Sequence, residues 1–114
     1  MEICRGDITI VDFEHVKGSE QGGIRPALVV QNDLGNRFSP TTIVAPITAK
    51  KFTKEYPTNV FLPAEDSGLK KDSTILLNQI KTIDSRRIKK RVKKLEGIIM
   101  KKVDFAIKIS LALN

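Results

Sequence analysis

From Ile8 to Ile83, the apolar residues occur in short runs that are rich in β-branched side chains and end at turn-forming residues. β-Branched residues favour strands, whereas Gly, Pro, Asn and Asp favour the turns between them. The runs cover Ile8–Phe13, Pro26–Gln31, Thr41–Thr48, Thr58–Leu62 and Ser73–Ile83. Short strands at this spacing predict a small β-barrel rather than a sheet of alternating strands and helices.

Two of the runs carry information about their place in the sheet. Pro46 interrupts Thr41–Thr48, and because proline cannot donate a backbone hydrogen bond, it predicts an edge strand or a bulge. Ser73–Ile83 is the longest run, and alternation gives it two faces, neither of which is wholly apolar. Part of this strand should therefore meet solvent or a ligand.

The C-terminal part of the chain has helical spacing instead. After Gly97, the apolar residues gather on one stripe with most lysines off it, which predicts a C-terminal helix. The stripe consists of Ile99, Val103, Ala106, Ile107, Ser110 and Leu113. Asp84–Arg87 is typical of a turn or a helix cap, and periodicity alone predicts a helix for Ile88–Leu95. Residues 1–114 are expected to form a single domain, mainly β with short helices.

The charge balance predicts a polyanionic partner. Twenty Lys and Arg against 13 Asp and Glu give a formal net charge of +7, which attracts phosphates, although a basic balance also serves solubility. Charges interrupt every apolar run and the N-terminus has no apolar signal segment, so we expect a cytoplasmic protein that does not enter a membrane. Cys4 is alone, which leaves no internal disulfide and no zinc-ligand spacing.

The loop Lys17–Pro26 is the segment that folding explains least. It contains three glycines and the polar residues Ser19, Glu20, Gln21 and Arg25. Glycine lets a backbone approach a ligand, and an arginine fork can hold phosphate oxygens. The loop has neither a Walker motif nor a dinucleotide-binding motif. A solvated hairpin loop with ordinary turn glycines is the alternative interpretation.

The segment Gly18–Asn32, which reads GSEQGGIRPALVVQN, resembles the signature segment of MazF/PemK toxins. Three further blocks resemble that family in the same order, namely Asn32–Thr48, Asp72–Asp84 and Ile109–Leu113. The resemblance implies a homodimeric SH3-like barrel with a C-terminal helix. It also implies cleavage of single-stranded RNA at a short sequence and neutralisation by an acidic, MazE-like antitoxin peptide. Finally, it places residues 90–95 on a last strand, which we prefer to the helix that periodicity predicts.

The resemblance also assigns candidate site residues. Arg25 matches the essential arginine after the Gly-Gly pair, and Thr48 matches the essential threonine that closes the third strand. Ser19, Glu20 and Gln21 fall on the loop that borders the cleavage site. Weaker candidates for base or phosphate contacts, which are equally explained as polar strand residues facing water, are Asn32, Ser73, Asn78, Gln79 and Thr82.

RNA cleavage without a metal or cofactor needs a base for the 2′-hydroxyl, an acid for the leaving 5′-oxygen and charge stabilisation at phosphorus. A histidine pair is impossible within one chain, because His15 is the only histidine. We expect Arg25 and Thr48 to stabilise the phosphorane and Glu20 to assist as base, since arginine is a poor base at neutral pH. The expected products are a 2′,3′-cyclic phosphate and a 5′-hydroxyl. A metal site built from Asp12, Glu14 and His15 is disfavoured, because strand alternation sends His15 to the other face.

The small share of aromatic residues, 5%, predicts base recognition by hydrogen bonding more than by stacking. The residues Phe13, Phe38, Phe52, Tyr56 and Phe61 are expected mostly in the core or as loop anchors. Two other functions remain open. A gyrase inhibitor of the CcdB type would share the fold, but that group depends on a tryptophan-containing tail and this chain has no Trp. A basic RNA-binding barrel without catalysis is the second alternative.

Overall fold

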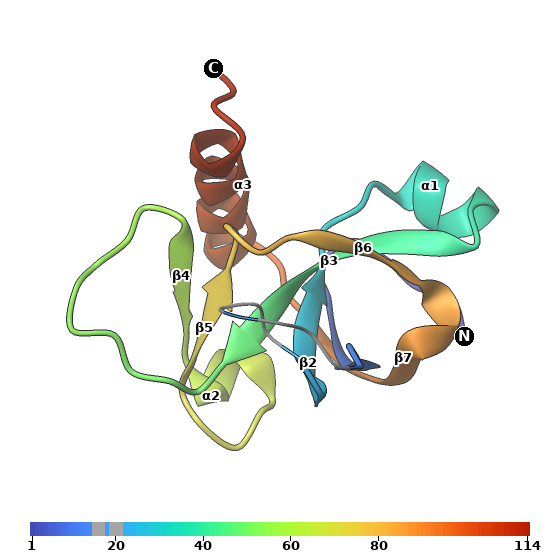
Figure 1. The fold of residues 1–114 in the computed structure, drawn as a ribbon, viewed down its shortest axis with the longest axis horizontal. Helices are drawn as coiled ribbons and strands as arrows, with labels where there is room; N and C mark the ends of the chain where they lie inside the picture. Colours follow the sequence, from blue (N-terminus) through green and yellow to red (C-terminus); the bar gives the residue numbers. More distant parts are fainter. Residues whose placement is uncertain (15–17, 19–21) are drawn as a thin grey trace.

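Seven strands and a C-terminal helix form the framework of the part of the chain that the structure describes. A computed structural model describes residues 1–14, 18 and 22–114 (Figure 1). The strands are β1 (Asp7–Asp12), β2 (Ile24–Val29), β3 (Thr41–Thr48), β4 (Asn59–Leu62), β5 (Ser73–Leu76), β6 (Lys81–Asp84) and β7 (Ile88–Lys94). The helices are α1 (Asp33–Phe38), α2 (Ala64–Ser67) and α3 (Ile98–Ser110), with a 3₁₀ turn, η1, at Ser85–Arg87. None of the described helices is both long and apolar enough to cross a membrane.

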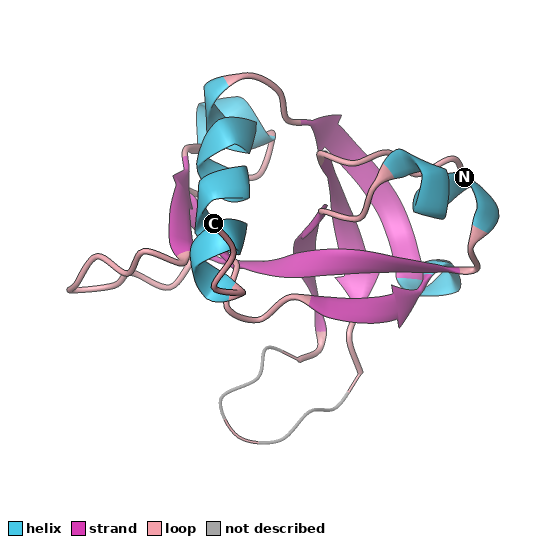
Figure 2. Cartoon of the chain, turned by 90° about the horizontal axis from the view of Figure 1, so that it is seen from above, coloured by secondary structure: helices cyan, strands magenta, loops and turns pink. Residues whose placement is uncertain are grey.

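The strands form one antiparallel sheet in the order β4-β5-β3-β2-β1-β7, and β6 also pairs with β3. The prediction of a mainly β fold with a C-terminal helix is therefore confirmed. The sheet curls around its core, as Figure 2 shows, but hydrogen bonds do not close it. Within the described residues, β4 and β7 are its two ends, and no pairing joins them.

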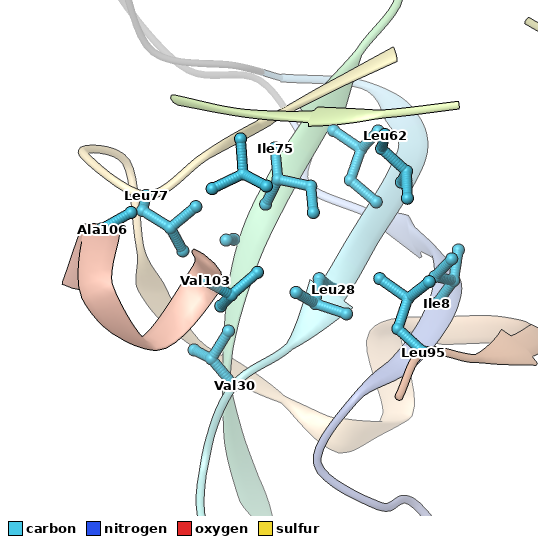
Figure 3. Close-up of a cluster of buried hydrophobic side chains, with 12 residues drawn as sticks. Ile8, Leu28, Val30, Leu62, Ile75, Leu77, Leu95, Val103 and Ala106 are labelled. Atoms are coloured by element: carbon cyan, nitrogen blue, oxygen red, sulfur yellow. The ribbon is translucent and has the colours of Figure 1, made fainter. Parts of the chain in front are cut away.

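Two apolar clusters lie on the two faces of the sheet. The larger one includes Leu28 and Ile47 from the strands, and α3 contributes Val103 and Ala106 to it (Figure 3). The smaller cluster, on the other face, includes Val11, Phe13, Ala27, Val29 and Val44. The helix α3 covers the face that carries the larger cluster. Polar side chains of the strands can therefore gather at the margin of the other face, around the smaller cluster.

The long strand predicted over Ser73–Ile83 is in fact two strands, β5 and β6, and both lie alongside β3. Between the pairs Val44↔Lys81 and Ile47↔Ile75, β3 has two residues whereas the opposite segment has five. The three extra residues form a turn, in which the Gln79 N–H donates to the Leu76 carbonyl at 3.1 Å. Alternation continues into both strands, so the local pattern does not reveal the break.

Pro46 predicts an edge strand or a bulge, and the edge is wrong, because β3 is central and pairs with β2 on one side and with β5 and β6 on the other. Pro46 lies opposite Ala27 of β2. On the other side it falls in the gap between the β6 and β5 pairings, where β3 needs no hydrogen-bond donor. The proline is therefore accommodated without an edge.

Residues Ile88–Lys94 form the strand that the family resemblance implies and not the helix that periodicity predicts. Two irregularities in the β1–β7 pairing shift the alternation of β7. As a result, the residues that pack into the two apolar clusters, Ile88, Val92 and Leu95, fall at helical spacing although the backbone is extended. The turn signals after Gln31 also open a short helix, α1, which the pattern of apolar runs does not predict.

Candidate active site

The two strongest candidates, Arg25 and Thr48, lie on neighbouring strands. The β2–β3 register pairs Val29 with Val44 and Ala27 with Pro46. Continued by two residues, it brings Arg25 opposite Thr48, and opposite residues of an antiparallel pair point to the same face. This is the face of the smaller apolar cluster, since Arg25 also lies opposite Val11 of β1.

Local hydrogen bonds hold both side chains at the margin of that cluster. The Arg25 Nε donates to the Gly22 carbonyl at 2.7 Å, which ties the guanidinium to the end of the loop that precedes it. The Thr48 Oγ1 accepts from the Lys50 N–H at 3.1 Å, so the hydroxyl can still donate its own hydrogen. Both side chains are half-buried. The arrangement presents a guanidinium and a hydroxyl donor to one anionic group.

Two further cations border this face. The Lys81 Nζ lies 5.5 Å from the centre of the Phe13 ring, on the same side of the sheet as Val44. Arg87 of η1 forms an ion pair with Glu14 at 2.5 Å. Hydrogen bonding to Glu14 raises the pKa of Arg87, so this guanidinium stays charged. The positive potential here suits a phosphate.

The base of the β1–β2 loop is closed by backbone bonds around Glu14. The Phe13 N–H donates to the Gly23 carbonyl and the Gly23 N–H donates to the Glu14 carbonyl, each at 2.9 Å. Glu14 has a positive φ of 59°, a conformation that residues other than glycine rarely adopt. Its ion pair with Arg87 therefore connects the start of this loop to η1. The loop candidates Ser19, Glu20 and Gln21 lie outside the described residues, as does His15.

Two of the weaker candidates lie away from Arg25. Asn32 is the N-cap of α1, and its Oδ1 accepts from the Gly35 N–H at 2.7 Å, at the opposite end of β2 from Arg25. Thr82 is exposed opposite Ile43, so it points to the other face from Lys81. The structure explains Asn32 by capping and Thr82 by exposure on a strand.

The other three weaker candidates flank the two ends of β5. Ser73 is buried, and its Oγ donates to the Lys71 carbonyl at 3.0 Å. Asn78 is exposed in the turn between β5 and β6, and the half-buried Gln79 follows it. Of these, only Ser73 lies beside the residue that pairs with Thr48, because Thr48 is opposite Thr74.

A feature not predicted from the sequence is a hollow of about 790 Å³ next to Thr48. The segment between β3 and β4 forms much of its wall and projects from the body of the molecule (Figures 1 and 2). The expectation that the aromatic residues lie mostly in the core or anchor loops holds for Phe13, which is buried. It does not hold for Phe38, Phe61 or Tyr56, which are 72%, 62% and 48% exposed. The alternation of lysines and aromatic residues in KKFTKEY is the signal that could have found this wall.

Comparison with known proteins places the chain and its fold in a family. Residues 4–111 match the family model of the PemK-like, MazF-like toxin of type II toxin-antitoxin systems. This chain belongs to that family. It is 52% identical over 113 residues to Endoribonuclease EndoA of Bacillus subtilis, and the match covers 99% of this chain and 97% of that relative.

Solved structures of MazF toxins have the same fold. MazF of Deinococcus radiodurans (Form-I) superposes with a TM-score of 0.83 at 24% identity, with 99% of each chain covered. An endoribonuclease from a mycobacterial species, in complex with its cognate antitoxin, superposes with a TM-score of 0.82 at 20% identity, covering 98% of this chain and 97% of that one. The predicted MazF/PemK endoribonuclease toxin is thus confirmed, and neither alternative function is favoured. Among the described residues, no group of three or more Asp, Glu, His or Cys side chains is placed to hold a metal ion.

Proposed function

We propose that this MazF-family toxin cleaves single-stranded messenger RNA at a short sequence without a metal ion, using Arg25 and Thr48. The observation that carries the proposal is the β2–β3 register, which brings these two side chains to one face at the open margin of the sheet. The Bacillus subtilis relative is named an endoribonuclease, which supports the reaction class. Such cleavage inhibits translation and growth.

The reaction is an attack of the 2′-oxygen on the neighbouring phosphorus. The bond from phosphorus to the 2′-oxygen forms and the bond to the 5′-oxygen breaks, which leaves a 2′,3′-cyclic phosphate and a 5′-hydroxyl. Arg25 binds two non-bridging oxygens as their negative charge grows, and Thr48 donates a third hydrogen bond. Both interactions strengthen in the transition state, so they raise the rate more than they raise affinity.

Two protons move in this reaction. The 2′-hydroxyl gives its proton to a base, and the 5′-oxygen takes one as it leaves. Glu20 is the proposed base, because a carboxylate is ionised at neutral pH and can accept a proton, whereas an arginine is already protonated. Ser19 and Gln21 are proposed to contact the RNA beside it.

The proposed partners follow from the charge and from the relatives. Relatives from mycobacteria and Deinococcus radiodurans have been solved in complex with an antitoxin or with MazE. A net charge of +7 suits an acidic antitoxin peptide on this chain as well. We also propose a homodimer that acts in the cytoplasm, since the exposed Leu111 and Leu113 after α3 offer apolar area to a second copy.

The test is incubation of the purified protein with a long single-stranded RNA in EDTA, followed by mapping of the cut ends. The wild type should cut at one short sequence, and Arg25→Ala should lower the rate by about 100-fold or more, as loss of a transition-state donor does. Arg37→Ala is the control, because it removes the same charge from an exposed position on α1. RNA that stays intact with the wild type, or is cut equally by Arg25→Ala, would contradict the proposal.

A further inference from the structure

The hollow beside Thr48 has walls that the cleavage chemistry does not use. It is lined by residues 49–52 and 54–57, by Asn59 and Phe61 of β4, and by Asp72 with the first two residues of β5, Ser73 and Thr74. Phe52 and Tyr56 meet edge to face in its wall, with ring centres 6.1 Å apart and planes at 79°. The Lys50 Nζ lies 5.4 Å from the centre of the Phe52 ring. The wall therefore combines aromatic rings with three lysines, Lys50, Lys51 and Lys54, which outnumber the two carboxylates of Glu55 and Asp72.

Strand register connects this hollow to the proposed active site. Thr48 lies opposite Thr74, and Thr74 lies opposite Phe61. Opposite residues share a face, so one row of side chains runs from Arg25 through Thr48 and Thr74 to Phe61. Neighbouring strands are about 4.8 Å apart, which places Phe61 about 10 Å from Thr48 across the sheet. A strand of RNA held at Thr48 has its next nucleotides within reach of the hollow.

The exposure of the rings shows that folding does not use them. Phe61 is 62% exposed and Tyr56 is 48% exposed, whereas the neighbours of Phe61 on β4, Val60 and Leu62, are buried in the larger cluster. A flat aromatic surface beside lysines fits an unpaired nucleobase and its phosphate, because every base has a π-face and every linkage carries a negative charge. An acidic peptide would use the lysines and the apolar area, but it would not require ring faces or a place in the row that begins at Arg25.

From these observations we infer that the hollow is a nucleobase-binding site for RNA next to the scissile phosphate. Tyr56 and Phe61 stack on an unpaired base, and Lys50 with Lys54 holds the adjoining phosphate. The inference rests on the proposed function and deepens it. It also means that stacking contributes to RNA recognition here, despite the small number of aromatic residues in the chain.

The experiment pairs a protein substitution with removal of single bases from the RNA. A synthetic RNA with one cleavage site is prepared as a series in which an abasic ribose replaces one nucleotide at a time. For the wild type, one position beside the cut bond should show a loss in kcat/KM of about 5- to 150-fold, the range expected for one stacked base. For Tyr56→Ala combined with Phe61→Ala, the intact RNA should show that same loss, and the abasic substitution at that position should cost nothing further.

The matched control is Phe38→Ala, which removes an aromatic ring that is 72% exposed on α1. At every position of the abasic series, this variant should show the same loss in kcat/KM as the wild type. The midpoint of thermal unfolding should be the same for all variants, because the substituted rings are exposed. Equal abasic losses in the double variant and the wild type, with the RNA still cleaved, would overturn the nucleobase site and leave the proposed function standing. If, with equal abasic losses, a glutamate-rich peptide also inhibits the wild type and not the double variant, the hollow binds protein instead of a base. RNA left intact by the wild type would overturn both.

Discussion

At the scale of single residues, the hydroxyl of Thr48 and the guanidinium of Arg25 have separate tasks in the proposed reaction. Arg25 is proposed to bind phosphate through its charge before and during reaction, whereas Thr48 is proposed to supply one neutral donor. The Thr48 Oγ1 accepts from the Lys50 N–H, so its orientation is fixed before RNA arrives. A hydroxyl that is already oriented does not have to rearrange when the phosphorane forms, so no free energy is spent on reorganisation. The rate is therefore expected to depend on the hydroxyl more than affinity does.

Thr48→Val tests this directly, because valine keeps the shape of the side chain and removes the hydroxyl. We expect kcat to fall by about 100-fold with little change in KM, as for removal of one transition-state donor. Single-turnover cleavage measures the effect. Thr82→Val is the control on an exposed strand position of the other face, and it should cleave as the wild type does. A rise in KM at constant kcat would assign Thr48 to ground-state binding instead.

Asp84 illustrates how a single cap responds to pH. Its carboxylate accepts hydrogen bonds from the side chain and the backbone N–H of Arg86, which lower the pKa of Asp84 to about 2 from an ordinary value of 3.8. A lowered pKa in the folded state stabilises the fold above pH 3.8, and this stabilisation is lost as pH falls toward about 2. An NMR titration of the carboxyl carbon should show the low midpoint. A midpoint at 3.8 would mean that η1 is not capped in solution.

At the scale of elements, the ion pair between Arg87 and Glu14 holds η1 against the base of the β1–β2 loop. Both side chains are partly exposed, so solvent screens the pair and it contributes little to stability. Its effect should instead be on the position of the loop between β1 and β2, which carries Glu20 and precedes Arg25. Arg87 does not need to touch RNA for this, and it is a positioning residue.

Arg87→Glu should therefore lower kcat several-fold while the midpoint of thermal unfolding changes little. Adding Glu14→Arg restores the ion pair with reversed charges, and it should return most of the rate. Steady-state cleavage and thermal unfolding of the two single variants and the double variant complete the cycle. If the double variant is as slow as Arg87→Glu, the charge of Arg87 acts on the RNA itself and not through Glu14.

Local sequence patterns predict an element well where the burial of its own residues determines it. They predict it poorly where the pairing of strands determines it. The five predicted runs all contain strands, and the stripe after Gly97 is helix α3. The break inside Ser73–Ile83 and the central place of Pro46 depend on how β3 is paired, which no single run encodes. In the same way, family resemblance identifies Arg25 and Thr48, but only the register brings them together. The exposed rings of the hollow could not be predicted, because composition does not show which side chains of a strand or a loop point to solvent.

Gly6 joins elements that are far apart in the sequence. Its N–H donates to the Val29 carbonyl and its carbonyl accepts from the Leu95 N–H, each at 2.8 Å. Its φ is +96°, and a Cβ there would lie 2.9 Å from the Leu95 oxygen. Gly6→Ala should therefore lower the free energy of unfolding by about 1–3 kcal/mol, as strained backbone does. Gly97→Ala, with a positive φ but open space around it, should cost less in the same denaturant titration.

At the scale of the whole molecule, a net charge of +7 attracts RNA everywhere, but only cations that touch phosphates release counterions. The salt dependence of binding therefore shows where the RNA lies. Lys50 and Lys54 line the hollow, whereas Lys93 and Lys94 pair with the start of β1, at the opposite end of that strand from the residue that faces Arg25. Substituting either pair by glutamine removes the same charge. The two variants thus differ in location alone.

The plot of log K against log salt for a single-stranded RNA should flatten by about 0.7 for each phosphate that the protein no longer neutralises. We expect this for Lys50→Gln with Lys54→Gln and no change of slope for Lys93→Gln with Lys94→Gln. Binding is measured with the Arg25→Ala protein, so that the RNA stays intact. Equal slopes for both variants would mean that the RNA avoids the hollow and senses only net charge. A flatter slope for the β7 pair alone would place the strand of RNA along the opposite end of the sheet.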